Sequence, residues 1–221
     1  MPRDTFETRL DALQTDVCAL GRDVTERLDR AITAYEDRDH AAGRAVAEAD
    51  DEINERYLDL EAECIDLLAL HQPVASDLRL VVASFKILTE LERVGDLATN
   101  LGGYADDLAG ETVPSVPITD IGEMVLSQLD AAVTAYEQQD PERCRTVAAA
   151  DTDLDQRCGA ATSDLVRSLV NRSPDDDVAE TLSDTKRYLL TVRDLERAGD
   201  HAVNIAARTL YMVENDDDLI Y

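Results

Sequence analysis

The chain has 221 residues, 44% of them hydrophobic, and its 48 acidic and 21 basic residues give a formal net charge of −27. This hydrophobic content can bury a core, which excludes a disordered tail and suffices for one large or two small domains. The acidic surface repels phosphate backbones and anionic lipids, so we expect no direct nucleic acid partner. Aromatic residues make up only 4% and Trp is absent, which predicts an all-α fold.

The basic residues are strongly biased toward arginine. Lysine occurs only at Lys86 and Lys186, so arginine supplies the other 19 (21 minus 2). This bias, with Asp in excess over Glu, is typical of halophilic proteins from a very salty cytoplasm, where molar salt shortens the Debye length to about 3 Å. The sequence shows neither an apolar signal region nor a segment long enough to cross a bilayer, so we expect a cytoplasmic protein without membrane insertion.

Three long helices are predicted in the first half. The first spans residues 5–35, because apolar residues recur there at spacings of three and four: Leu10, Leu13, Val17, Leu20, Val24 and Leu28. Asp39 is expected to cap a second helix, which continues through Val46 and Ile53 and ends before Pro73. The third helix runs over residues 75–108.

The second half repeats this plan. The helical pattern breaks between Gly110 and Pro117, which predicts domains at residues 1–110 and 118–221. Thr33-Ala34-Tyr35-Glu36 matches Thr134-Ala135-Tyr136-Glu137 at an offset of 101 (136 minus 35). We therefore predict a tandem pair of three-helix bundles related by pseudo-twofold symmetry, with a single six-helix array as the alternative. A later segment repeats at an offset of 104 (196 minus 92), so three residues were gained, which we place at 171–177.

That later segment is ten residues long and carries a pair of acids in each copy. It reads LERVGDLATN at 91–100 and LERAGDHAVN at 195–204. Its Glu and Asp are four residues apart, so they project from one face of a helix, one turn apart. The second helix of each half adds its own pair at the same spacing. If neighbouring helices face each other, two sets of oxygen ligands form: Asp50, Asn54, Glu92 and Asp96, then Asp151, Asp155, Glu196 and Asp200.

Oxygen-only ligands favour magnesium, manganese, calcium or iron over zinc and Cu(I), so we predict metal ions on both carboxylate clusters. The competing interpretation is a solvated acidic face, on which Arg93 and Arg197 form ion pairs with the Asp three residues later. His201 lies about 100° around the helix from Asp200, so we expect a packed or surface histidine and not a ligand. His40 and His71 lie near predicted helix ends.

Other residues extend the repeated motif. They are Gln72-Pro73-Val74-Ala75-Ser76-Asp77-Leu78-Arg79, ahead of Glu92-Arg93-Val94-Gly95-Asp96, and the second copy Glu196-Arg197-Ala198-Gly199-Asp200-His201. In these segments, and over nearly its whole length, the chain resembles the PhoU family of phosphate-signalling proteins. The resemblance implies tandem three-helix bundles whose acid pairs hold metal ions or multinuclear clusters, iron among them. It also implies a negative regulator of phosphate uptake that acts on subunits of the phosphate ABC transporter and, in many bacteria, on a sensor histidine kinase.

Two positions depart from a symmetric pattern. Asn54 stands where the second half has Asp155, and the Gln-Pro-x-x-Ser-Asp-Leu-Arg segment has no second copy. Alternatives to a non-enzymatic, metal-binding regulator are a di-metal carboxylate oxidase and a metal-free helical scaffold. The oxidase class needs His three residues after Glu, where this chain has Gly95 and Gly199. The sequence leaves open whether the protein forms a homodimer.

Overall fold

The computed structural model describes residues 3–108, 118–170 and 178–220, and in these ranges the chain forms seven α-helices and no strand. The helices are α1 (Arg3–Asp37), α2 (His40–Glu48), α3 (Asp50–His71), α4 (Ala75–Asp106), α5 (Thr119–Gln138), α6 (Pro141–Val170) and α7 (Val178–Glu214). The all-α prediction is confirmed. The predicted domain boundary and the predicted site of the three extra residues lie outside the described ranges.

Side chains and backbone turns fix the helix ends where the sequence indicates them. The Oδ1 atom of Asp39 accepts a hydrogen bond from the backbone N–H of Ala42 at 3.0 Å and so caps α2, as predicted. Asp140, at the equivalent position, caps α6 by accepting from the N–H groups of Glu142 and Arg143 at 3.0 and 3.1 Å. Gln72 ends α3 in the left-handed conformation, directly before Pro73.

The predicted second helix is wrong in one respect, because it is interrupted. The backbone leaves helical geometry at Ala49 (φ −90°, ψ 22°), between α2 and α3. Arg27 of α1 stabilises this break: its Nη1 donates to the Ala49 carbonyl at 2.8 Å and its Nη2 to the Val46 carbonyl at 2.9 Å. The Val46 carbonyl otherwise accepts only a long hydrogen bond from the Ala49 N–H, at 3.4 Å, and carbonyls at a helix end commonly need such additional partners. Gln128 occupies the equivalent position in the second half (27 plus 101), and α6 runs on without a break.

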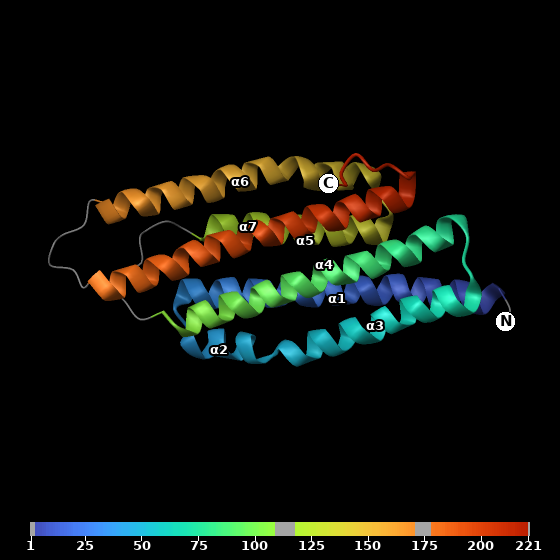
Figure 1. The fold of residues 1–221 in the computed structure, drawn as a ribbon, viewed down its shortest axis with the longest axis horizontal. Coiled ribbons are helices and arrows are strands. Elements are labelled where there is room, and N and C mark those ends of the chain that lie inside the picture. Colours follow the sequence, from blue (N-terminus) through green and yellow to red (C-terminus); the bar gives the residue numbers. More distant parts are fainter. Residues whose placement is uncertain (1–2, 109–117, 171–177, 221) are drawn as a thin grey trace.

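The seven helices form two bundles that share a central layer. The first bundle is α1, α4 and the α2–α3 pair, and the second is α5, α6 and α7. Between the bundles, α4 packs against α7 and α1 packs against α5. Figure 1 shows α2 and α3 covering one side of this four-helix centre and α6 covering the other. This arrangement confirms the predicted pair of bundles, and none of the described helices has the length and apolar character needed to span a membrane.

A pair of reciprocal contacts between α1 and α5 shows the pseudo-twofold symmetry. A Cβ atom added to Gly21 would lie 2.7 Å from Cγ2 of Val133, and one added to Gly122 would lie 2.9 Å from Cγ2 of Ile32. The offset of 101 converts Gly21 into Gly122 and Ile32 into Val133. Each half therefore inserts a branched side chain against a glycine of the other, as in an interface between two equal partners.

A second glycine pair brings α2 close to α4. A Cβ atom on Gly102 would lie 2.7 Å from the carbonyl oxygen of Gly43, and one on Gly43 would lie 2.7 Å from that of Gly102. The two backbones are thus in direct contact. The equivalent positions in the second half are Cys144 (43 plus 101) and Ala206 (102 plus 104), so α6 and α7 have side chains at this crossing.

Candidate metal centre

The second half brings its four predicted acids within electrostatic reach of one another. Asp151 and Asp155 lie on α6, while Glu196 and Asp200 lie on the facing helix α7. Burial raises the pKa of Asp151 to about 6, and the charges of Asp155, Asp200 and Glu196 add to this rise. The pKa values of Glu196 and Asp200 are raised by burial first and by the charge of Asp155 second. The arrangement therefore accumulates negative charge that a cation would relieve.

The cluster is open rather than tightly closed. In the part of the chain that the structure describes, three carboxylates lie within 4.8 Å of one another only at Asp216, Asp217 and Asp218, an exposed run near the C-terminus. The four acids of α6 and α7 are thus gathered on one face, but they are not drawn together at ligand spacing. Arg197, on the same helix as Glu196 and Asp200, forms its ion pair with Asp194, whose Oδ1 lies 3.9 Å from the arginine Nη1.

Two buried polar groups beside the cluster lack a well-formed hydrogen bond among the described residues. Gln128 of α5 is only 5% exposed, and neither its Oε1 nor its Nε2 atom, nor Oδ1 of Asp151, makes a bond of good geometry, although the Gln128 amide interacts with Asp151 and partly offsets the rise in its pKa. Both side chains lie over Gly199, since a Cβ atom there would be 3.1 Å from Gln128 Oε1 and 3.7 Å from Asp151 Oδ1. Unsatisfied buried oxygens cost free energy, and a bound cation is one way of satisfying them. The donor set therefore fits a hard metal ion.

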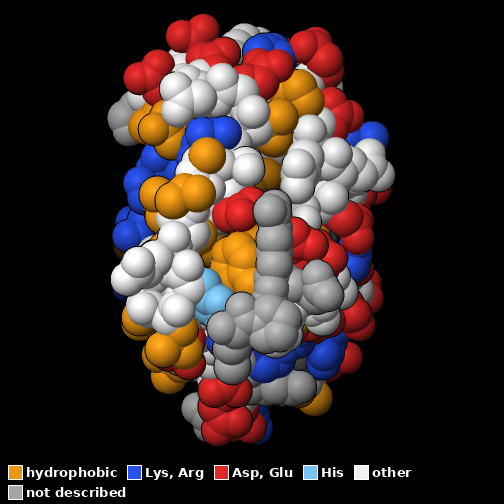
Figure 2. Space-filling model, turned by 90° about the vertical axis from the view of Figure 1, so that its right-hand side faces the viewer, with side chains coloured by type: hydrophobic (Ala, Val, Ile, Leu, Met, Phe, Trp, Pro, Cys, Tyr) orange, Lys and Arg blue, Asp and Glu red, His pale blue; other side chains and the backbone are white. Residues whose placement is uncertain are grey.

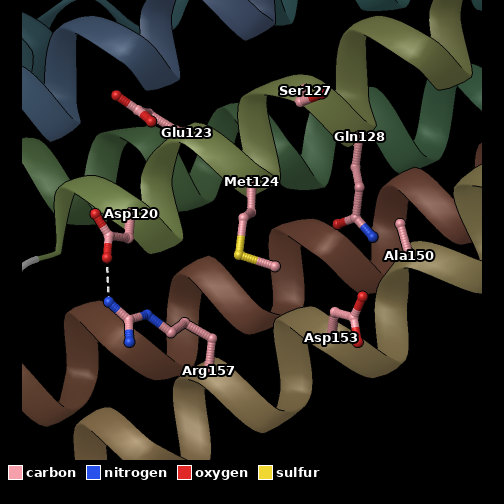
Figure 3. Close-up of a pocket in the computed structure, with 8 residues that line it drawn as sticks. All are labelled: Asp120, Glu123, Met124, Ser127, Gln128, Ala150, Asp153 and Arg157. Atoms are coloured by element: carbon pink, nitrogen blue, oxygen red, sulfur yellow. Dashed lines mark hydrogen bonds and ion pairs between the residues drawn. The ribbon is translucent and has the colours of Figure 1, made fainter.

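Gln128 also belongs to a hollow of about 520 Å³ between α5 and α6. Figure 3 shows its lining, with the Asp120–Arg157 ion pair at one end and Gln128 extending from α5 toward α6 at the other. Sequence reasoning missed Gln128, because a single amide on a largely apolar helix face carries no charge pattern. Its alignment with Arg27 at the offset of 101 was the one available signal.

The first half places its repeated segment in the same way, with α4 facing α3. A Cβ atom on Gly95 would lie 3.4 Å from Cγ2 of Ile53 on α3. Burial raises the pKa of Tyr57 on α3, and the Glu92 carboxylate of α4 contributes to the rise, so this acid faces α3. Asn54 is half-buried, whereas Asp96 is exposed. Asp50 begins α3, but its side chain lies outside the described residues.

The histidines take structural positions. His201 is buried, and its Nδ1 lies 2.7 Å from Oε2 of Glu90 on α4, an oxygen that also accepts from Asn204 Nδ2 at 3.2 Å. Burial alone would raise the pKa of Glu90, but the His201 hydrogen bond and charge outweigh it and lower the pKa. The expectation that His201 is packed is confirmed, and the contact joins the two halves. His40 and His71 lie at helix ends, as predicted.

The cysteines are structural as well. All four belong to the described residues, and each is buried and free of disulfide bonds: Cys18, Cys64, Cys144 and Cys158. Burial raises their pKa values to about 11 or 12, so they are thiols at neutral pH. This excludes them as ready thiolate ligands for a soft metal.

Hydrophobic side chains reach the surface at the end of the molecule where α4 begins. Figure 2 shows them at that end among acidic and basic side chains. Val74 is 72% exposed and Leu78 is 39% exposed. Arg79, in the same segment, donates from Nε to the carbonyl of Met212 at 3.1 Å and so braces α4 against α7.

The fold defines a class of all-helical proteins with two similar bundles, and the second bundle presents acid pairs on the facing helices α6 and α7. The chain belongs to the PhoU domain family, whose model matches residues 17–105 and 118–209. This confirms the resemblance drawn from the sequence motifs.

Curated relatives and solved structures agree with this assignment. A "phosphate-specific transport system accessory protein PhoU homolog" from Pseudomonas aeruginosa is 33% identical over 96% of this chain and 86% of its own length. The PhoU accessory protein of Escherichia coli is 28% identical over the same shares. The crystal structure of PhoU from Pseudomonas aeruginosa has a TM-score of 0.88 at 30% identity, covering 96% of this chain and all of that one. PhoU from Streptococcus pneumoniae, at 24% identity and a TM-score of 0.88, shares the fold.

Proposed function

We propose that this protein is a non-enzymatic, cytoplasmic regulator of phosphate uptake, which acts through contacts with the phosphate ABC transporter and holds metal ions on its carboxylate clusters. The observation that carries the transport role is the match of both halves to relatives named as accessory proteins of the phosphate-specific transport system, over 96% of the chain. Contacts with a sensor histidine kinase, and a homodimer, belong to the same proposal.

The metal part of the proposal is supported by the second cluster. Its acids raise one another's pKa, and Asp151 Oδ1 and Gln128 Oε1 make no well-formed hydrogen bond among the described residues. A bound magnesium, manganese or iron ion would supply the opposing positive charge. Asp151, Asp155, Glu196 and Asp200 would hold it in the second half, and Asp50, Asn54, Glu92 and Asp96 are the candidates in the first.

The metal content of purified protein tests this part. We expect the wild type to retain Mn²⁺ or Fe²⁺ after gel filtration in molar KCl, and a quadruple variant to lose it while keeping its helical circular dichroism signal. The variant is E92Q, D96N, E196Q and D200N. A matched control neutralises four exposed acids on α1 and α5 instead: D11N, D16N, D29N and D130N. Full metal occupancy in the first variant would refute the ligand assignment, and a wild type without metal would favour the scaffold.

Phosphate uptake in cells tests the transport role. We expect deletion of the gene to leave uptake high when phosphate is abundant, because the negative regulator is missing, and expression of the wild type to restore control. The exposed hydrophobic segment at the start of α4 is the candidate contact surface, so a V74E/L78E variant should fold but not restore control. Normal regulation in the deletion strain at high and low phosphate would refute the role.

Oxygen consumption by purified protein after ferrous loading would instead favour the oxidase.

A further inference from the structure

The two halves contain equivalent hollows of different size. The first, lined by α1, α2 and α3, has a volume of about 230 Å³, against about 520 Å³ for the one between α5 and α6. Their linings correspond at the offset of 101: Arg27 to Gln128, Ala49 to Ala150 and Arg56 to Arg157. An ion pair bounds each hollow, Arg56–Asp23 in the first and Arg157–Asp120 in the second. Position 27/128 is one chemical difference between the matched hollows; Asp23 and Glu26 of the first, which correspond to Met124 and Ser127 of the second, are others.

Arg27 places a permanent positive charge between the α2–α3 break and α4. The residue is only 6% exposed, and its guanidinium donates to the carbonyls of Ala49 and Val46. Its Nη2 also donates to Oγ1 of Thr99 on α4 at 3.0 Å. Thr99 follows Glu92 by seven residues and Asp96 by three, so it shares their face of the helix. The guanidinium thus contacts α4 about one turn from Asp96 and two turns from Glu92, on the face that carries both acids.

The second half has no such charge at the equivalent position. Gln128 is neutral and buried, makes no well-formed hydrogen bond among the described residues, and lies over Gly199 beside Asp151, with which its amide interacts. Counting formal charges, the first set has three carboxylates and one guanidinium (−3 plus 1, or −2), and the second has four carboxylates (−4). The second cluster therefore combines the greater negative charge with buried oxygens that make no well-formed hydrogen bond among the described residues.

Resting on the proposed function, we infer that the two clusters are not equivalent toward metal: the second binds a divalent cation, and in the first the guanidinium of Arg27 takes the place of one. Arginine cannot be deprotonated at any physiological pH, so this internal cation is always present. A metal ion bound to Asp96 would meet a like charge about one helical turn away, and the burial of Arg27 limits screening of that charge even in strong salt.

Exchange of the two residues tests the inference. Protein stripped with a chelator is titrated with Mn²⁺ in molar KCl, and free Mn²⁺ is followed by electron paramagnetic resonance. We expect one strong site in the wild type, a loss of affinity of at least about tenfold in Q128R, and a second strong site in R27Q. The double exchange R27Q/Q128R should again give one strong site, now dependent on Glu92 and Asp96. R22Q removes an arginine from an exposed position of the same helix and should behave as the wild type.

A second set of variants guards against misfolding of R27Q. The E196Q/D200N variant, which keeps Arg27, should show almost no strong Mn²⁺ binding. The titration of R27Q counts only if its circular dichroism shows native helicity. Q128R, which needs no change in the first half, tests the inference independently. Two equal strong sites in the wild type, or unchanged affinity in Q128R, would overturn the inference and leave the proposed metal binding intact. Absence of Mn²⁺ binding in every variant would refute both.

Discussion

Asp151 carries a carboxyl group whose ionisation opposes folding of the metal-free protein. Its pKa is raised to about 6 by burial and by three neighbouring acids, above the value of about 3.9 in an unfolded chain. A raised pKa contributes stability that is fully present below the unfolded value and is lost as the pH rises through the folded value. The group therefore weakens the metal-free fold progressively as the pH rises from about 4 to about 6, and the weakening persists at higher pH.

The D151N variant tests this at the residue scale. With metal chelated and KCl held at molar strength, we expect D151N to gain stability relative to the wild type as the pH rises through about 6, and to gain no stability from added Mn²⁺. Denaturant unfolding at several pH values measures both effects. D153N, which removes a charge from an exposed position of the same helix, is the control. Parallel pH curves for D151N and the wild type would contradict the assignment.

At the scale of single residues, the placement of the four acids of α6 and α7 on facing helices could be predicted from the sequence. Acids four residues apart must share a helix face, so placing Glu196 and Asp200 opposite Asp151 and Asp155 needed only the right helix pairing. Gln128 could not be found in the same way, since an amide among apolar residues does not reveal which helix it faces. The openness of the cluster also depends on the spacing between α6 and α7, which no local pattern specifies.

The approach of α2 to α4 shows how glycine sets the geometry of an element. Gly43 and Gly102 let the two backbones touch, and a methyl group on either would meet a carbonyl oxygen at 2.7 Å. Backbone cannot move aside as a flexible side chain can, so α2 would have to shift as a whole.

Alanine substitutions at two adjacent glycines test this contact. We expect G102A to lower the free energy of unfolding by about 1–3 kcal/mol, as overpacking of a close contact does. G103A should leave stability unchanged or raise it by about 0.5–1 kcal/mol, because no atom lies within 4 Å of its Cβ position and alanine favours the helix. Denaturant unfolding in molar KCl compares the two. Equal effects would show that helix propensity, not the crossing of α2 and α4, decides the outcome.

The elements themselves could be predicted from apolar periodicity, with one exception. The stripe from Leu10 to Leu28 and the cap at Asp39 predicted helices at the right places. The break at Ala49 could not be predicted from the local sequence, because alanine favours helix and the contact that stabilises the break comes from α1. It is Arg27, distant in sequence, whose guanidinium satisfies the carbonyls on the α2 side of the break.

At the scale of the whole molecule, the net charge of −27 couples stability to salt. Self-repulsion of this surface is strong when ions are scarce, whereas molar salt reduces the Debye length to about 3 Å and suppresses it. We expect partial unfolding when KCl falls from molar to millimolar concentration, seen as a loss of helical circular dichroism. Sucrose at matched osmolality controls for water activity. A signal that does not change with salt would refute this prediction and the halophilic interpretation.

The reciprocal contacts of Gly21 with Val133 and of Gly122 with Ile32 have a consequence for how the molecule could diversify. Two identical subunits joined by such contacts must carry the same residue at both copies of every position. Once both copies are encoded in one polypeptide, each can change alone while the shared seam keeps them paired. Arginine at position 27 and glutamine at the equivalent position 128 are a difference that a single fused chain can encode and a dimer of identical halves cannot.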